Sequence, residues 1–145
     1  MPTVDFFTNC WERDYREVLS PSFMRDKAAK FDYPFRSLIV TVNNVTNPAN
    51  VKQAAEEAIA RGDVDRVVFV EEGLPSALQI CGLTEADMGE VKNFTNFYLV
   101  MMTCTDADYI VNCAADIDLE QRFDWITPAL DKVESNKQYL VANPS

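Results

Sequence analysis

The stretch DYIVNCAADID, residues 108–118, holds a short apolar run followed by two carboxylates. An apolar run bounded by acids is typical of a strand buried in a parallel sheet. Asp116 and Asp118 stand one residue apart where that strand is expected to emerge. In an extended backbone, residues i and i+2 point to the same face, so both acids can address one cation. Carboxylate oxygens suit Mg²⁺ or Mn²⁺, and the stretch therefore predicts a divalent-cation site at a strand end.

The composition is that of an ordinary globular protein. The chain has 145 residues, of which 48% are hydrophobic and 25% charged. This length predicts one domain with a full core. The net charge of −10 argues against nucleic acid or an anionic membrane as a partner, because both attract basic patches. A phosphate-bearing ligand would need a metal or local cations to offset this charge.

The absence of histidine excludes several kinds of site. The sequence contains none, which removes Ser-His-Asp and Cys-His catalysis and histidine metal sites. The four cysteines are scattered without C-x-x-C spacing, as in a protein with reduced thiols. No apolar run approaches the length of a membrane span. We therefore expect a cytoplasmic protein without a membrane span.

Strand and helix signals alternate along the chain. Five segments are expected to form strands: Thr3–Thr8, Arg36–Val42, Asp65–Val70, the run from Tyr109, and Gln138–Val141. Helical patterns separate them, and this alternation predicts a three-layer α/β fold of Rossmann type. Its sheet is expected to be mainly parallel and five-stranded, with helices on both faces.

Local signals mark the helix ends. Asn47 is expected to cap a helix with Pro48 at its first position, and Gly62 to end that helix in a left-handed conformation. Thr84 and Asp124 are expected to cap two later helices. The run Phe94–Cys104 is apolar on nearly every side, which predicts a buried helix against the sheet. Its residues expected in the core are Tyr98, Leu99, Met101 and Met102.

Three stretches together resemble a known family. They are TNCWERD at residues 8–14, VNNVTN at residues 42–47 and TDADYIVNCAADIDL at residues 105–119. In this order they resemble the nucleotide-sugar-binding half of a glycosyltransferase with the GT-A fold, similar to the large family-two group. The third stretch is similar to that family's strand followed by an Asp-x-Asp pair. The resemblance covers nearly the whole chain in element order.

The resemblance implies a metal-dependent glycosyltransferase that binds a nucleotide-diphosphate sugar with Mn²⁺ or Mg²⁺. It makes Asp118 the metal ligand, with Asp116 assisting the metal or contacting the ribose. It places further residues beside the nucleotide: Thr8, Asn9, Trp11, Glu12, Arg13, Asn43 and Asn44. It identifies neither a catalytic residue nor the acceptor. Ligands of open α/β sheets bind outside the carboxyl ends of strands, where all three stretches are expected.

The chain departs from the family pattern in two places. Asn43 and Asn44 stand where the family usually has acids. The sequence also stops soon after the fifth expected strand, which suggests a truncated or minimal donor-binding domain over residues 1–145. An open sheet edge after Val141 is then expected to favour association with another chain.

Two other function classes stay open. One is a signalling or interaction domain similar to a response-regulator receiver. Receivers need clustered acids after the first strand and a lysine after the fifth, where this chain has Thr8-Asn9 and Ala142-Asn143. The other is a noncatalytic subunit of a larger complex, which the short length favours.

Overall fold

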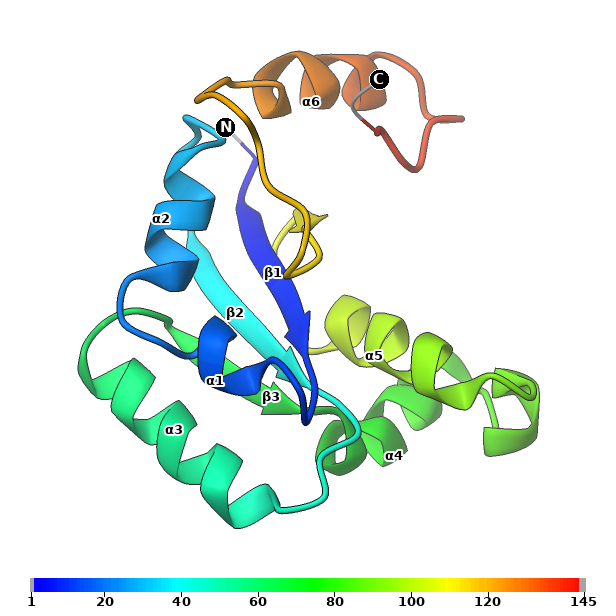
Figure 1. Cartoon of the computed structure of the whole chain (residues 1–145). Coiled ribbons are helices and arrows are strands. Elements are labelled where there is room, and N and C mark those ends of the chain that lie inside the picture. The colour runs from blue at the N-terminus through cyan, green and yellow to red at the C-terminus, as the bar shows by residue number, and fades with distance from the viewer. Residues whose placement is uncertain (1, 144–145) are drawn as a thin grey trace.

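The protein is described by a computed structural model that covers residues 2–143. Its sheet has four strands, all parallel, in the order β3-β2-β1-β4 (Figure 1). The strands are β1 (Val4–Cys10), β2 (Ser37–Val42), β3 (Arg66–Phe69) and β4 (Tyr109–Asn112). The α/β class and the parallel sheet expected from the sequence are therefore confirmed.

Helices connect every pair of consecutive strands. They are α1 (Tyr15–Val18), α2 (Phe23–Ala29), α3 (Pro48–Ala60), α4 (Val70–Cys81) and α5 (Lys92–Thr103), with α6 (Ile126–Ser135) after β4. A short 3₁₀ turn, η1 (Glu85–Met88), lies between α4 and α5. Helix α4 begins directly after β3, so Val70 starts the helix rather than ending the strand.

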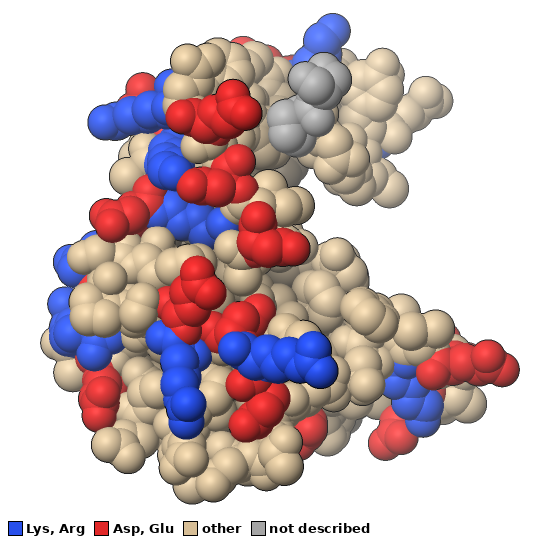
Figure 2. All heavy atoms as spheres, viewed as in Figure 1, with Lys and Arg blue, Asp and Glu red and all other residues tan. Residues whose placement is uncertain are grey.

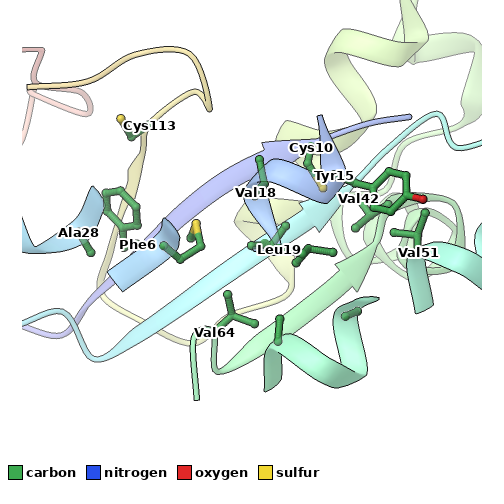
Figure 3. Close-up of a cluster of buried hydrophobic side chains, with 14 of the residues drawn as sticks. Phe6, Cys10, Tyr15, Val18, Leu19, Ala28, Val42, Val51, Val64 and Cys113 are labelled. Atoms are coloured by element: carbon green, nitrogen blue, oxygen red, sulfur yellow. The ribbon is translucent and has the colours of Figure 1, made fainter. Parts of the chain in front are cut away.

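The sheet separates two hydrophobic layers because neighbouring strand residues point to opposite faces. On one face Phe6 packs with side chains of α1, α2 and α3, as Figure 3 shows for part of this core. On the other face Phe7 and Ile39 pack against Met101 of α5. Helix α4 packs on α5 through a further cluster that contains Val70, Ala77 and Val100.

The order in which strands are added to the sheet changes side at β1. From β1 the chain moves through β2 to the edge strand β3, and it then crosses back to place β4 on the other side of β1. The crossover passes through α4 and α5, whereas the earlier connections use α1, α2 and α3. Such a reversal brings two strand ends together without a shared connection, and ligands of open α/β sheets commonly bind there.

The expected helix caps are present. The side chain of Asn47 accepts a hydrogen bond from the Asn50 amide, and Pro48 opens α3. Gly62 follows α3 with a φ of 73°, the left-handed conformation that glycine adopts without strain. Thr84 and Asp87 form a reciprocal capping box at η1. The Asp124 carboxylate accepts hydrogen bonds from the amide and the hydroxyl of Thr127 in the first turn of α6.

The expected fifth strand is not formed by the described residues. The segment Gln138–Val141 follows a turn after α6, and Leu140 and Val141 are 87% and 75% exposed. Its pattern is β-prone, but a strand also requires a neighbouring backbone for its hydrogen bonds. The sheet therefore has four strands rather than five. The association edge expected after Val141 is likewise not formed, and β4 is the edge strand on that side.

Helix α5 is buried on one face only, contrary to the expectation. Leu99 and Met101 are buried, but Tyr98 and Met102 are 46% and 58% exposed. The helix packs on the sheet and on α4, and none of the described elements covers its remaining side. Figure 2 shows a hollow between the regions of α5 and α6, walled mainly by uncharged side chains. Apolar residues all round a helix therefore did not indicate complete burial here.

Two further features concern the chain as a whole. Among residues 2–143, no helix is both long and apolar enough to cross a lipid bilayer. All four cysteines are free thiols, two of them buried.

Candidate functional site

The loop that leaves β1 forms one side of the candidate site. Trp11 is 41% exposed, and the Arg13 guanidinium carbon lies 5.1 Å from the centre of its ring. The carboxylate of Asp14 accepts a hydrogen bond of 2.7 Å from the Trp11 amide. The amides of Asp14 and Tyr15 in turn donate to the Trp11 carbonyl. This compact loop holds an exposed indole ring at the end of a buried strand.

Two residues expected beside a nucleotide have structural partners instead. Thr8 is fully buried, and its hydroxyl donates a hydrogen bond of 3.0 Å to the Cys113 carbonyl. Asn9 is half-buried and accepts a hydrogen bond of 3.1 Å from the Thr41 hydroxyl. Thr8 therefore ties β1 to the end of β4, and its hydroxyl is not presented to solvent.

The loop after β2 lies next to the loop after β1. The Glu12 carboxylate accepts a hydrogen bond of 2.7 Å from the Thr46 amide, which links the two loops. Asn43 is buried and its amide nitrogen donates to the Asn93 carbonyl at the start of α5. Asn44 is half-buried with a φ of 50°, in the left-handed region that asparagine tolerates. Asn43 therefore fixes the loop to α5 rather than facing an open pocket.

The acidic pair does not lie in an extended strand. Strand β4 ends at Asn112, and the Ile117 amide donates a hydrogen bond of 3.2 Å to the Ala114 carbonyl, which closes a turn around Asp116. Because the backbone turns, the alternation that would put Asp116 and Asp118 on one face does not apply. Asp118 forms an ion pair with Lys30 and accepts a hydrogen bond from the Leu119 amide. The two acids therefore have different surroundings.

The chain after this turn runs back along α2. Lys27 of α2 donates hydrogen bonds to the carbonyls of Ala115 and Ile117. Beyond the helix, the Phe123 amide donates to the Lys30 carbonyl, and Arg122 pairs with Asp32. This return path carries Asp118 along α2. Asp116 stays at the exposed turn, where no hydrogen bond or ion pair within the described residues engages its side chain.

The carboxyl groups near the exits of β1 and β4 have shifted pKa values in opposite directions. Burial raises the pKa of the Asp14 carboxyl, and the negative charges of Glu17 and Asp116 raise it further. The exits of the two strands adjoin because the Thr8 hydroxyl of β1 donates to the Cys113 carbonyl just after β4. The Lys30 ammonium, in contrast, lowers the pKa of Asp118. Figure 2 shows acidic and basic side chains intermingled over α1, α2 and the adjoining loops.

The sequence prediction missed three residues that shape this region, namely Asp14, Lys27 and Lys30. Asp14 ends the stretch TNCWERD at residues 8–14, and an acid three residues after a helix-start residue is at the spacing that lets it bind that residue's free amide. Lys27 and Lys30 lie three residues apart, so they share a helix face. Nothing in their local sequence indicates that this face meets the turn after β4.

The donor set at the β4 exit is compatible with a divalent cation. Within residues 2–143, no three Cys, Asp or Glu side chains form a metal-binding group. Mg²⁺, however, is usually held by one or two carboxylates together with substrate phosphates, so a larger protein cluster is not required. The surface has two shallow hollows at other places. One is lined by Pro2, Tyr109 and Glu134, and the other lies between α1 and α3.

Comparisons of this chain with protein-family models, with curated proteins and with solved structures found no match.

Proposed function

We propose that this chain is the donor-binding domain of a metal-dependent glycosyltransferase, which takes a nucleotide-diphosphate sugar. One observation carries the proposal: the exits of β1 and β4 adjoin where the strand order reverses, and the exposed carboxylate of Asp116 lies on the turn that follows β4. This is the place where open α/β sheets bind nucleotides. The assignment of this four-stranded α/β fold to the GT-A type belongs to this proposal.

Asp116 is the first candidate ligand for Mn²⁺ or Mg²⁺ in this proposal. Its side chain is exposed at the turn, whereas Asp118 is paired with Lys30 and would have to leave that lysine to join the ion. A divalent ion held there would offset the charge of a diphosphate and stabilise it as a leaving group. The protein's net charge of −10 makes such an ion more important for binding an anionic donor.

The β1 exit loop would hold the nucleoside. Trp11 offers an exposed aromatic ring on which a base can stack, and Arg13 lies close to that ring. Glu12 and Asn44 stand on the adjoining loops and can contribute polar contacts, and Asn9, near the end of β1, can do so only beside its hydrogen bond with Thr41. Thr8 and Asn43 would act indirectly by fixing the loops, because both are buried and hydrogen-bonded. We infer a cytoplasmic enzyme, in keeping with the free thiols.

The binding of Mn²⁺ with UDP or GDP tests this function. Isothermal titration calorimetry should detect binding of the nucleotide in the presence of Mn²⁺ and much weaker binding without it. Asp116→Asn should remove the dependence on Mn²⁺. Glu134→Gln, beside the first residue of β4 and therefore at the opposite end of the sheet, removes one acid and serves as the charge-matched control. The proposal fails if neither nucleotide binds, or if Asp116→Asn binds as the parent does.

A second candidate function is that of a noncatalytic subunit in a larger complex. The observation that favours it is the row Phe94, Tyr98 and Met102 on α5, spaced four residues apart and exposed. Large exposed apolar patches commonly mark interaction surfaces. Transferase assays with nucleotide sugars separate the two candidates, because a noncatalytic subunit would hydrolyse and transfer none of them.

A further inference from the structure

Lys27 is an unusual residue for the interior of a protein. Its relative exposure is 6%, although lysine is almost never fully buried without a partner. It lies in α2 between the core residues Met24 and Ala28. A residue that only filled space there would be apolar, because removing an ammonium group from water carries a large free-energy cost.

The partners of the Lys27 ammonium are main-chain oxygens. Its Nζ atom lies 3.2 Å from the Ala115 carbonyl oxygen and also donates to the Ile117 carbonyl. The Phe23 ring lies 5.7 Å from the same atom and adds a cation–π contact. No carboxylate within the described residues pairs with Lys27. The Lys27 ammonium group therefore binds main-chain oxygens of the turn after β4 and the Phe23 ring.

The two carbonyls that Lys27 holds belong to the residues on either side of Asp116. Fixing the carbonyls of Ala115 and Ile117 leaves the intervening residue little freedom to rotate about the backbone. The Ile117 amide is held as well, through its hydrogen bond to Ala114. Lys30 adds a second hold through its ion pair with Asp118. All these contacts constrain the backbone around Asp116 while leaving its carboxylate exposed.

We propose that Lys27 is a positioning residue, which fixes the turn Ala114–Ile117 so that the Asp116 carboxylate stands at the shared exit of β1 and β4. Its role in ligand binding rests on the proposed function, whereas its role in holding the turn does not. Residues that orient a metal ligand typically change metal affinity by about 10- to 100-fold when they are replaced.

Two variants of Lys27 test the proposal in the whole chain. Lys27→Met keeps the length and the apolar stem but removes the donors, and Lys27→Arg keeps a cation with donors. Lys52→Met, on the exposed Lys52 of α3, removes the same charge far from the turn. Where Lys27→Met does not fold, Lys27→Gln replaces it, because its amide retains donors without the charge.

The first measurement is amide hydrogen exchange, which needs no ligand. In Lys27→Met we expect the Ile117 amide to exchange about tenfold faster, while the Phe7 amide in β1 keeps its protection. Lys27→Arg should restore slow exchange, and Lys52→Met should leave it unchanged. An Ile117 amide that exchanges in Lys27→Met as in the parent overturns the proposal.

The second measurement is calorimetry with Mn²⁺ and UDP as the probe. Lys27→Met should weaken binding by about tenfold or more, and Lys27→Arg should recover most of it. Unchanged affinity in Lys27→Met overturns the link between Lys27 and the metal site. If the parent protein itself binds neither UDP nor GDP with Mn²⁺, the proposed function fails, and the exchange experiment still decides whether Lys27 holds the turn.

Discussion

The hydroxyl of Thr8 donates a hydrogen bond of 3.0 Å to the main-chain carbonyl of Cys113, although the two residues are 105 positions apart in the chain. Both residues are buried. The bond adds to the parallel pairing of β1 with β4 and continues it past the last strand pair, Phe7 with Asn112. It therefore fixes the point where the β4 chain turns away from the sheet.

Thr8→Val should destabilise the protein without changing its shape. Valine is nearly the same size as threonine, but it leaves the buried Cys113 carbonyl without its side-chain donor. The free energy of unfolding should fall by about 1–3 kcal/mol in urea denaturation. Thr46→Val, at an exposed threonine, should change it by less than about 0.5 kcal/mol. Equal effects of the two substitutions would contradict a structural role for the Thr8 hydroxyl.

The buried carboxylate of Asp5 predicts a pH dependence of stability. Burial by itself raises the pKa of Asp5, but hydrogen bonds from Arg36 and Thr105 outweigh it and leave the pKa below its ordinary value. Arg36 makes two of these bonds, of 2.9 and 2.7 Å. A carboxyl with a lowered pKa in the folded state stabilises the fold above its unfolded pKa of about 3.9. That contribution is lost as the pH falls through the folded pKa.

Asp5→Asn should therefore have its largest effect near neutral pH. The substitution should cost about 1–3 kcal/mol at pH 7, because a buried charged hydrogen bond is lost. Below about pH 4 the difference from the parent should shrink, as the parent protonates its own carboxyl. Asp106→Asn is the control, since Asp106 also pairs with Arg36 but is exposed, and it should have a much smaller effect. A pH-independent difference would show that Asp5 is not ionised in the fold.

Adjacent methionines test which face of α5 is buried. Met101 is 3% exposed and packs against Phe7 and Ile39, whereas Met102 is 58% exposed. Met101→Ala should lower the free energy of unfolding by about 2–5 kcal/mol. Met102→Ala should change it by less than about 0.5 kcal/mol. A large loss in Met102→Ala would indicate that a further segment covers this face in solution.

The sequence predicted the four strands and the helix caps because each depends on residues close together in the chain. The apolar runs of the four strands and the caps at Asn47 and Asp124 depend on neighbouring residues, and the structure confirms them. Gln138–Val141 shows the limit of this reasoning. The segment has strand propensity, but pairing requires an adjacent edge, which no local pattern can reveal.

The candidate site stays a prediction, and the surroundings of its two acids could not be predicted from the sequence. The apolar run correctly predicted β4, but the strand ends at Asn112, and the turn at Ala114–Ile117 separates the surroundings of Asp116 and Asp118. The turn is also bound from α2, because Lys27 donates hydrogen bonds to it from 88 and 90 residues away. Contacts of such long range leave no periodic trace in the sequence.

The two acids should differ in their effect on metal binding. In the parent, Mn²⁺ with UDP should raise the melting temperature, and ligand at a hundred times its dissociation constant adds about 2.7 kcal/mol of stability. Asp116→Asn should abolish this rise. Asp118→Asn should reduce it less, because Asp118 must first leave Lys30. Differential scanning fluorimetry with each component alone and together measures the effect, and a stronger loss in Asp118→Asn would reverse the assignment.

Trp11 should report nucleotide binding directly. The chain has two tryptophans, and Trp11 is exposed at the β1 exit whereas Trp125 packs against Phe31 with ring centres 6.1 Å apart. A base that stacks on the Trp11 indole should quench its fluorescence when UDP is added with Mn²⁺. Trp11→Phe should remove the quenching. It should weaken binding by less than the roughly 1–3 kcal/mol that loss of a stacking ring costs, because phenylalanine retains part of the stacking surface. Trp125→Phe should keep the quenching. A signal that survives in Trp11→Phe and disappears in Trp125→Phe would place the nucleotide away from the β1 exit.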